Sequence, residues 1–143
     1  MAIACLATAV LAAGCGDDPL ASFRERQLQP LEARVDQQRA KLAALLRVVR
    51  PGSHADAEAV RQATGPLAAS ARQAAVLDPP SQAARAKRTY AAALAALTRE
   101  LDRFSHVLES DGTTALDRAA TRVRNAVGGL EEATIAFDRS VAG

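Results

Sequence analysis

The side chains best suited to chemistry in this sequence are two cysteines and two histidines. Cys5 and Cys15 both lie within the first fifteen residues, and no cysteine follows them. If the chain is cut before Cys15, one cysteine remains, at the new N-terminus, and no internal disulfide can form. The stability of the fold would then depend on side-chain packing alone.

The histidines, His54 and His106, are the next candidates, as metal ligands. Di-iron helical bundles bind their metals through Glu-x-x-His pairs, and this sequence contains none. We interpret both histidines as solvent-exposed side chains. The alternative is a weak metal site shared by the two near one end of the fold.

Other reaction chemistries lack their sequence motifs. There is no Cys-x-x-Cys-His haem motif, and Met1 is the only methionine. No serine lies in a nucleophile elbow, and no glycine-rich phosphate loop is present, because Gly128-Gly129 falls within a helical pattern. With Tyr90 the only tyrosine and no tryptophan, aromatic platforms for bases or sugars are lacking. We predict a protein that is not an enzyme and binds no cofactor.

An uncharged apolar segment, residues 2–13, precedes Cys15. It is too short to span a bilayer, which needs about 20 residues, but it fits the apolar core of a secretory signal. It ends in Ala12-Ala13-Gly14-Cys15, which resembles the lipobox of bacterial lipoprotein precursors. The resemblance implies cleavage between Gly14 and Cys15 and acylation of Cys15, for example by palmitate.

This resemblance also implies a cellular location. We expect a signal peptide over residues 1–14, whose basic n-region is missing, with the true start upstream of Met1. Residues 15–19 would be the lipidated cysteine and a short tether, and residues 20–143 the folded domain. Two or three acyl chains give stable anchoring, where a single chain is marginal. We therefore expect a protein of the bacterial cell envelope, anchored to the cytoplasmic or the outer membrane.

The composition predicts that the domain is all-α. Hydrophobic residues make up 49% of the chain and aromatic residues only 3%, so alanine and leucine dominate the apolar content. β-branched residues are sparse, which disfavours a sheet. The net charge is +2 and the two signs are interspersed, a pattern typical of solvated helix surfaces and not of a nucleic-acid partner.

Four apolar stripes of helical period follow Leu20. The first stripe is Leu28, Leu31, Val35, Gln38, Leu42, Leu45 and Val49. The second is Val60, Ala63, Leu67, Ser70 or Ala71, Ala74 and Leu77. The third is Tyr90, Leu94, Leu97, Leu101, Phe104 and Leu108. The fourth is Leu116, Ala120, Val123, Val127, Leu130, Thr134, Phe137 and Val141. Steps of three and four residues form heptad-like seams, as in coiled coils.

Three turn signals separate these stripes: Pro51-Gly52, Asp78-Pro79-Pro80 and Ser110-Asp111-Gly112-Thr113. Helix N-terminal caps are expected at Asp18, at Ser53 with Asp56, at Asp78, and at Thr114 with Asp117. Pro30 and Gly65-Pro66 interrupt helical stretches, so we expect kinks or breaks there. The paired glycines Gly128-Gly129 are expected to weaken the last helix and to admit a close neighbour.

Short turns between long helices predict an antiparallel up-down-up-down four-helix bundle with a left-handed twist. The turn at Asp78-Pro80 and the C-terminus would share the anchored end. Pro51-Gly52 and the turn near Ser110 would form the distal end. Basic residues expected at the anchored end could contact anionic headgroups: Arg24, Arg26, Arg85, Lys87 and Arg88. Acidic residues at that end nearly cancel them: Asp17, Asp18, Glu25, Asp78 and Asp138.

Two functions remain open from the sequence. The first is a non-catalytic scaffold or protein-interaction module that binds an envelope protein or a second copy of itself. The alternative is a bundle that binds a small apolar ligand or a metal, with a cavity left by small side chains such as Ala63, Ala71, Ala74 and Ala120. Gln38 is the one polar member of the first seam. It lies either at a solvated edge or buried, where it would determine helix pairing.

Overall fold

A computed structural model of the chain describes residues 18–110 and 112–142, and every regular element within them is helical. The elements are α1 (Pro19–Phe23), the π-helical segment η1 (Arg24–Leu28), α2 (Gln29–Leu46), α3 (His54–Val76), the 3-10 turn η2 (Ser81–Ala83), α4 (Ala84–Leu108) and α5 (Thr113–Val141). The all-α prediction is confirmed. The expected signal peptide and Cys15 lie outside the described residues. None of the described helices has the length and apolar character needed to cross a membrane.

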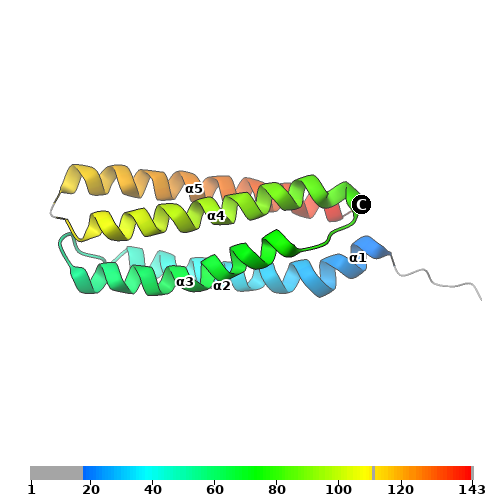
Figure 1. The fold of residues 1–143 in the computed structure, drawn as a ribbon, viewed down its shortest axis with the longest axis horizontal. Coiled ribbons are helices and arrows are strands. Elements are labelled where there is room, and N and C mark those ends of the chain that lie inside the picture. Colours follow the sequence, from blue (N-terminus) through cyan, green and yellow to red (C-terminus); the bar gives the residue numbers. More distant parts are fainter. Residues whose placement is uncertain (1–17, 111, 143) are drawn as a thin grey trace, which may run out of the picture.

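The long helices lie side by side along the long axis of the molecule (Figure 1). The helix α3 packs on both α2 and α4, and α4 packs on α5, whereas α2 and α5 have little direct backbone contact. At one end the backbone N–H of Gly52 donates a hydrogen bond to the carbonyl of Leu108, at 2.8 Å. This bond joins the turn after α2 to the end of α4, so the two turns expected at the distal end do meet.

The first helical stretch begins as expected and changes its winding before Pro30. The Asp18 carboxylate accepts a hydrogen bond from the backbone N–H of Leu20, at 3.0 Å, and Pro19 occupies the first turn. The π-helical segment then separates α1 from α2, and the N–H of Gln29 bonds the carbonyl of Arg24, five residues back. Pro30 cannot donate a backbone hydrogen bond, and the widened turn precedes it. The predicted short first piece is therefore present, joined by a π turn and not by a break.

Of the kink or break expected at Gly65-Pro66, the break does not occur, because α3 continues without interruption from His54 to Val76. Pro66 removes one backbone donor on an exposed face, where water can satisfy the freed carbonyl. Leu67 on the opposite face is fully buried, and Thr64 donates its hydroxyl to the carbonyl of Val60 at 2.7 Å. Packing of α3 between α2 and α4 outweighs the local preference for a break.

The helix caps follow the sequence in part. Ser53 caps α3, since its hydroxyl accepts the N–H of Asp56 at 3.2 Å. The Asp56 carboxylate does not make the reciprocal hydrogen bond to the backbone of Ser53. It instead accepts hydrogen bonds from the backbone N–H and the Nε of Arg50, at 2.9 and 3.2 Å.

The two remaining cap predictions are wrong. Asp78 caps no helix, because Pro79 and Pro80 lead into the short turn η2, which has no side-chain cap. The predicted cap at Thr114 fails because α5 begins one residue earlier, after Gly112, and also lacks a side-chain cap.

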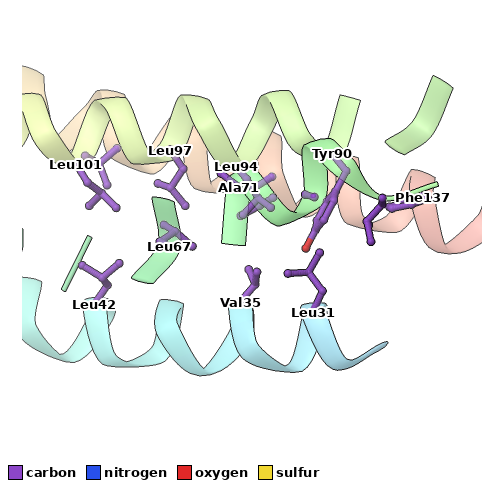
Figure 2. Packing of buried hydrophobic residues seen from close by; sticks show 14 of the residues in the cluster. Leu31, Val35, Leu42, Leu67, Ala71, Tyr90, Leu94, Leu97, Leu101 and Phe137 are labelled. Carbon is purple, nitrogen blue, oxygen red and sulfur yellow. The ribbon is translucent and has the colours of Figure 1, made fainter. Parts of the chain in front are cut away.

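The core follows the predicted stripes most closely on α4, where all six stripe residues are buried. Figure 2 shows Leu97 and Leu101 of α4 packed toward Leu42 of α2 and Leu67 of α3. At the opposite end the Phe137 ring lies 6.1 Å from Phe23 and 5.5 Å from Tyr90, between ring centroids. Three of the four aromatic residues of the chain therefore gather near the N-terminal end of α2.

The predicted stripe on α5 is correct only in part. Leu116, Ala120, Val127 and Thr134 are partly exposed, while Ala119 and Ala133 are buried in their place. The shift reflects the open side of α5 toward α2, which leaves one edge of the stripe uncovered. The expected close approach at Gly128-Gly129 is also wrong, since a Cβ added at either glycine would meet no atom within 4 Å.

Candidate functional site: the seam between α2 and α5

The side of the bundle between α2 and α5 is not closed by helix packing, and it contains a half-open groove of about 340 Å³. The groove is lined by Asp36, Arg39, Ala40, Leu42, Ala43, Leu46, Leu97, Leu101, Val123 and Val127. These residues come from α2 and α5 as walls and from α4 as the floor. We call this region, together with the residues that continue it toward the N-terminal end of α2, the seam.

The groove is apolar because of the residues that α2 and α4 place there. Ala40 and Ala43 have side chains too small to reach α5, and they leave Leu97 and Leu101 of α4 as the floor. These two leucines are only 2% and 1% exposed. An apolar cavity of ~150 Å³ can hold a benzene ring, so the groove has room for about two side chains of that size. Apolar side chains are what this space fits.

A single ion pair crosses the seam beside the groove. Arg39 of α2 donates from Nη2 to the Glu131 carboxylate of α5 at 2.6 Å. The same guanidinium lies 3.7 Å from Asp36, three residues earlier on α2. The Arg39 side chain is mostly shielded from solvent, whereas Glu131 is largely exposed. The pair joins two helices that otherwise have little direct contact.

Acidic groups collect at the other end of the seam, around Glu32 of α2. The pKa of Glu32 is raised from 4.5 to about 7, chiefly by burial and also by the nearby charges of Asp138 on α5 and Asp36 on α2. Arg24 lowers this pKa, but by less than those three effects raise it. The Oε1 atom of Glu32 is buried and has no hydrogen-bond partner among the described residues.

Two further buried polar atoms of the described chain lack a hydrogen-bond partner: the hydroxyl of Tyr90 and the Nε of Arg24. The charge of Arg24 lowers the pKa of Glu32, and the charge of Glu32 raises the pKa of Tyr90. Tyr90 is fully buried, and burial together with the charge of Glu32 raises its pKa. In Figure 2 its hydroxyl points from α4 toward α2, beside Leu31, the neighbour of Glu32 in sequence. Buried polar groups are normally hydrogen-bonded, so this end of the seam is unusual.

The seam therefore has two chemical zones: an apolar groove at one end and a group of carboxylates at the other, with the Arg39–Glu131 pair on the same α2–α5 side. Asp36 belongs to both zones, because it lines the groove and also acts on Glu32. This arrangement can bind apolar groups and attract positive charge. Among residues 18–110 and 112–142, no three His, Cys, Asp or Glu side chains are placed to hold a metal ion.

The two histidines lie elsewhere, on exposed surfaces. The His54 side chain is 81% exposed, and its Nδ1 lies 2.9 Å from Glu109 Oε1, an oxygen that also accepts a hydrogen bond from Arg61. His106 is exposed too and lies 3.8 Å from Asp102, one turn earlier on α4. Each histidine has a different carboxylate neighbour, so the structure does not bring them together as one site.

Gln38 combines the two interpretations that the sequence left open. Its side chain is half-buried, at the edge of the α2–α3 contact. The Ser70 hydroxyl of α3, whose residue is 1% exposed, donates a hydrogen bond to Gln38 Oε1 at 3.1 Å. Gln38 thus lies at an edge and still pairs specifically with the neighbouring helix.

The basic residues expected to contact headgroups are not all free to do so. Arg24 is half-buried near Glu32, and Lys87 donates its ammonium to the carbonyl of Ala75 at 3.0 Å. Arg26, Arg85 and Arg88 are exposed. Any electrostatic contribution to membrane contact would come from these three arginines.

Sequence reasoning missed the seam, although a signal was present. Glu32, Asp36, Arg39, Ala43 and Leu46 form a second stripe on α2 with the same steps of four and three residues. This stripe is charged at its start and apolar at its end, so it does not stand out as a core stripe.

Comparison of the chain with family models, curated proteins and solved structures finds no match.

Proposed function

We propose that this protein is a lipid-anchored, non-catalytic interaction module of the bacterial cell envelope. Its bundle is an antiparallel up-down-up-down arrangement, and the groove between α2 and α5 receives apolar side chains of a partner protein. The observation that carries the binding function is the half-open groove of about 340 Å³. The anchoring rests on the resemblance of Ala12-Ala13-Gly14-Cys15 to a lipobox.

The anchor places constraints on where a partner could be. The helical part of the chain begins at Pro19, so only Gly16, Asp17 and Asp18 separate the acylated Cys15 from α1. Such a short tether keeps the N-terminal end of α2 close to the membrane, on the cytoplasmic or the outer membrane. A partner that binds the seam would belong to the envelope and to the same membrane surface. Nucleic acid is not among the partners we propose.

Water exclusion supplies the energy for binding in the groove. Burying apolar surface stabilises a complex by about 25 cal/mol per Å², less the entropy lost on association. The walls are helices, so the groove is preformed and little ordering is required of this chain. A helix that lays two or three apolar side chains into a groove between helices is a common recognition mode.

The anchor is tested by the intact mass of the protein from the detergent phase of a bacterial host, with a basic n-region added to the start of the chain. We expect the mass of residues 15–143 plus acyl chains. In a Cys15→Ser variant the acylation should be lost. An unmodified and uncut wild-type chain would refute the anchor.

The groove is tested by placing a photocrosslinking amino acid at Ala43 or at Ala44 of the full chain in its host membrane. Ala43 lines the groove, whereas Ala44 is exposed on the same helix and does not line it. We expect a protein crosslink from position 43 that an Ala40→Phe substitution abolishes, and none from position 44. Equal crosslinking at both positions, or none at position 43, would contradict the proposal.

A small apolar ligand in the same groove is the second candidate, favoured by a volume within the ~300–1,000 Å³ typical of ligand pockets. This site differs from the cavity that the sequence offered as an alternative, between small side chains. Ala74 is fully buried between helices, Ala71 borders a hollow between α3 and α4, and neither lines the groove. Native mass spectrometry of the purified chain would reveal a bound ligand, and a ligand displaced by Ala43→Phe but not by Ala44→Phe would favour this candidate.

A further inference from the structure

We propose that the partner of the seam is an amphipathic helix that carries a lysine or arginine, whose positive charge lies beside Glu32 and Asp138 while its apolar side chains occupy the groove. This inference rests on the proposed function and identifies the class of partner. It follows from charge complementarity along a single open side of the bundle.

The first argument is the excess of carboxylates at one end of the seam. Asp36 of α2 and Asp138 of α5 both raise the pKa of Glu32 there, and among the described residues Arg24 is the cation that lowers it. Arg39 is engaged by Glu131 and Asp36. On the opposite face of α2, Arg34 donates to Gln73 of α3, away from the seam. The acidic end therefore lacks a cation that matches its charge.

The second argument is that the described residues leave buried polar atoms at this end without hydrogen-bond partners. Glu32 Oε1 is buried without a partner, and so is the hydroxyl of the fully buried Tyr90, which points toward α2 (Figure 2). A buried carboxylate oxygen without a donor destabilises the fold. An ammonium or guanidinium group of a partner would place a positive charge beside the partly exposed Glu32 side chain. Burial, followed by the charges of Asp138 and Asp36, raises the pKa of Glu32 at the same place.

The third argument is distance along the helix. Glu32 precedes Ala40 by eight residues and Ala43 by eleven, which corresponds to about 12–17 Å at ~1.5 Å per residue. A partner helix aligned with α2 would thus carry its basic residue two to three turns from its apolar side chains. The Arg39–Glu131 pair lies between, so the partner would pass over it.

The experiment uses the full chain in mild detergent and three labelled synthetic helical peptides. Each peptide has three leucines on one face. The peptides differ at one position, eight to eleven residues from the leucines, where one carries lysine, one glutamine and one glutamate. Fluorescence anisotropy gives the dissociation constants at pH 6 and pH 8. We expect the lysine peptide to bind at least tenfold more tightly than the glutamate peptide at pH 8.

The pH dependence follows from Glu32. A bound cation favours the ionised carboxylate, so below pH 7 binding must first displace a proton. We expect the lysine peptide to bind about tenfold more weakly at pH 6 than at pH 8, and the glutamine peptide to show no such change. In Glu32→Gln the pH dependence should disappear and the preference for lysine should fall several-fold. Asp138→Asn should also reduce the preference for lysine.

The control is Glu132→Gln, the same change at an exposed carboxylate of α5 that does not act on Glu32. Ala43→Phe should weaken all three peptides equally. If Ala43→Phe abolishes binding but the lysine, glutamine and glutamate peptides bind alike, the groove stands and this inference is overturned. If Ala43→Phe has no effect, the proposed function itself fails. A chain that sediments as a dimer and becomes monomeric in Ala43→Phe would assign the groove to a second copy, which also overturns the inference.

Discussion

The substitution Glu32→Gln is expected to stabilise the protein at alkaline pH and to lose that advantage at acid pH. The folded-state pKa of Glu32 is about 7, above its ordinary value of 4.5, so the folded chain holds this proton more tightly than the unfolded chain. The stability that the proton confers is complete below pH 4.5 and is lost as the pH rises through 7. Glutamine is always neutral, so the variant escapes this loss.

The magnitude follows from the same two values. A change in pKa from 4.5 to about 7 corresponds to ~3 kcal/mol at full strength, since one pKa unit equals about 1.4 kcal/mol. Glu32 is only half-buried, so solvent screening reduces this to roughly 1–2 kcal/mol. We expect the difference in free energy of unfolding between Glu32→Gln and wild type to grow by that amount between pH 5 and pH 8.

Urea unfolding followed by circular dichroism at pH 5, 6, 7 and 8 measures this difference. The matched control is Glu132→Gln, an exposed position on α5 where we expect no change with pH. The reasoning fails if Glu32→Gln has the same effect at pH 5 and pH 8, or if the variant is less stable than wild type at pH 8. Either result would mean that the Glu32 carboxylate is well solvated or paired.

Three further predictions concern the packing of the bundle. Gly129→Ala, alone or with Gly128→Ala, should raise the free energy of unfolding by about 0.5–1 kcal/mol per site in urea unfolding, since a Cβ meets nothing within 4 Å and alanine favours the helix. Phe137→Ala should lower the midpoint of urea unfolding and cost about 3–5 kcal/mol, because Phe137 is fully buried against Phe23 and Tyr90; a loss below 1 kcal/mol would contradict that packing. A double-mutant cycle on Arg39 and Glu131 should give a coupling of at most about 1 kcal/mol that shrinks in high salt, because Glu131 is largely exposed.

The helices and most of the core could be predicted from the sequence because they depend on local periodicity. The stripe from Tyr90 to Leu108 is buried as predicted, and Asp18 and Ser53 cap their helices because the cap acts within three residues. Local rules failed where tertiary packing competes with them. Pro66 does not break α3, because the buried Leu67 face is packed between two helices.

The seam could not be predicted, because it depends on which helix pairs remain unpacked. A stripe from Glu32 to Leu46 appears as ordinary helix surface in the sequence, and only the spacing of α2 from α5 turns its apolar half into a groove. The raised pKa of Glu32 likewise depends on burial between helices, and then on the charge of Asp138, more than one hundred residues away in the sequence. Helical content and turns could thus be predicted from the sequence, since each is encoded by neighbouring residues. The groove and its acidic end were decided by tertiary structure, since burial and charge coupling depend on distances between helices.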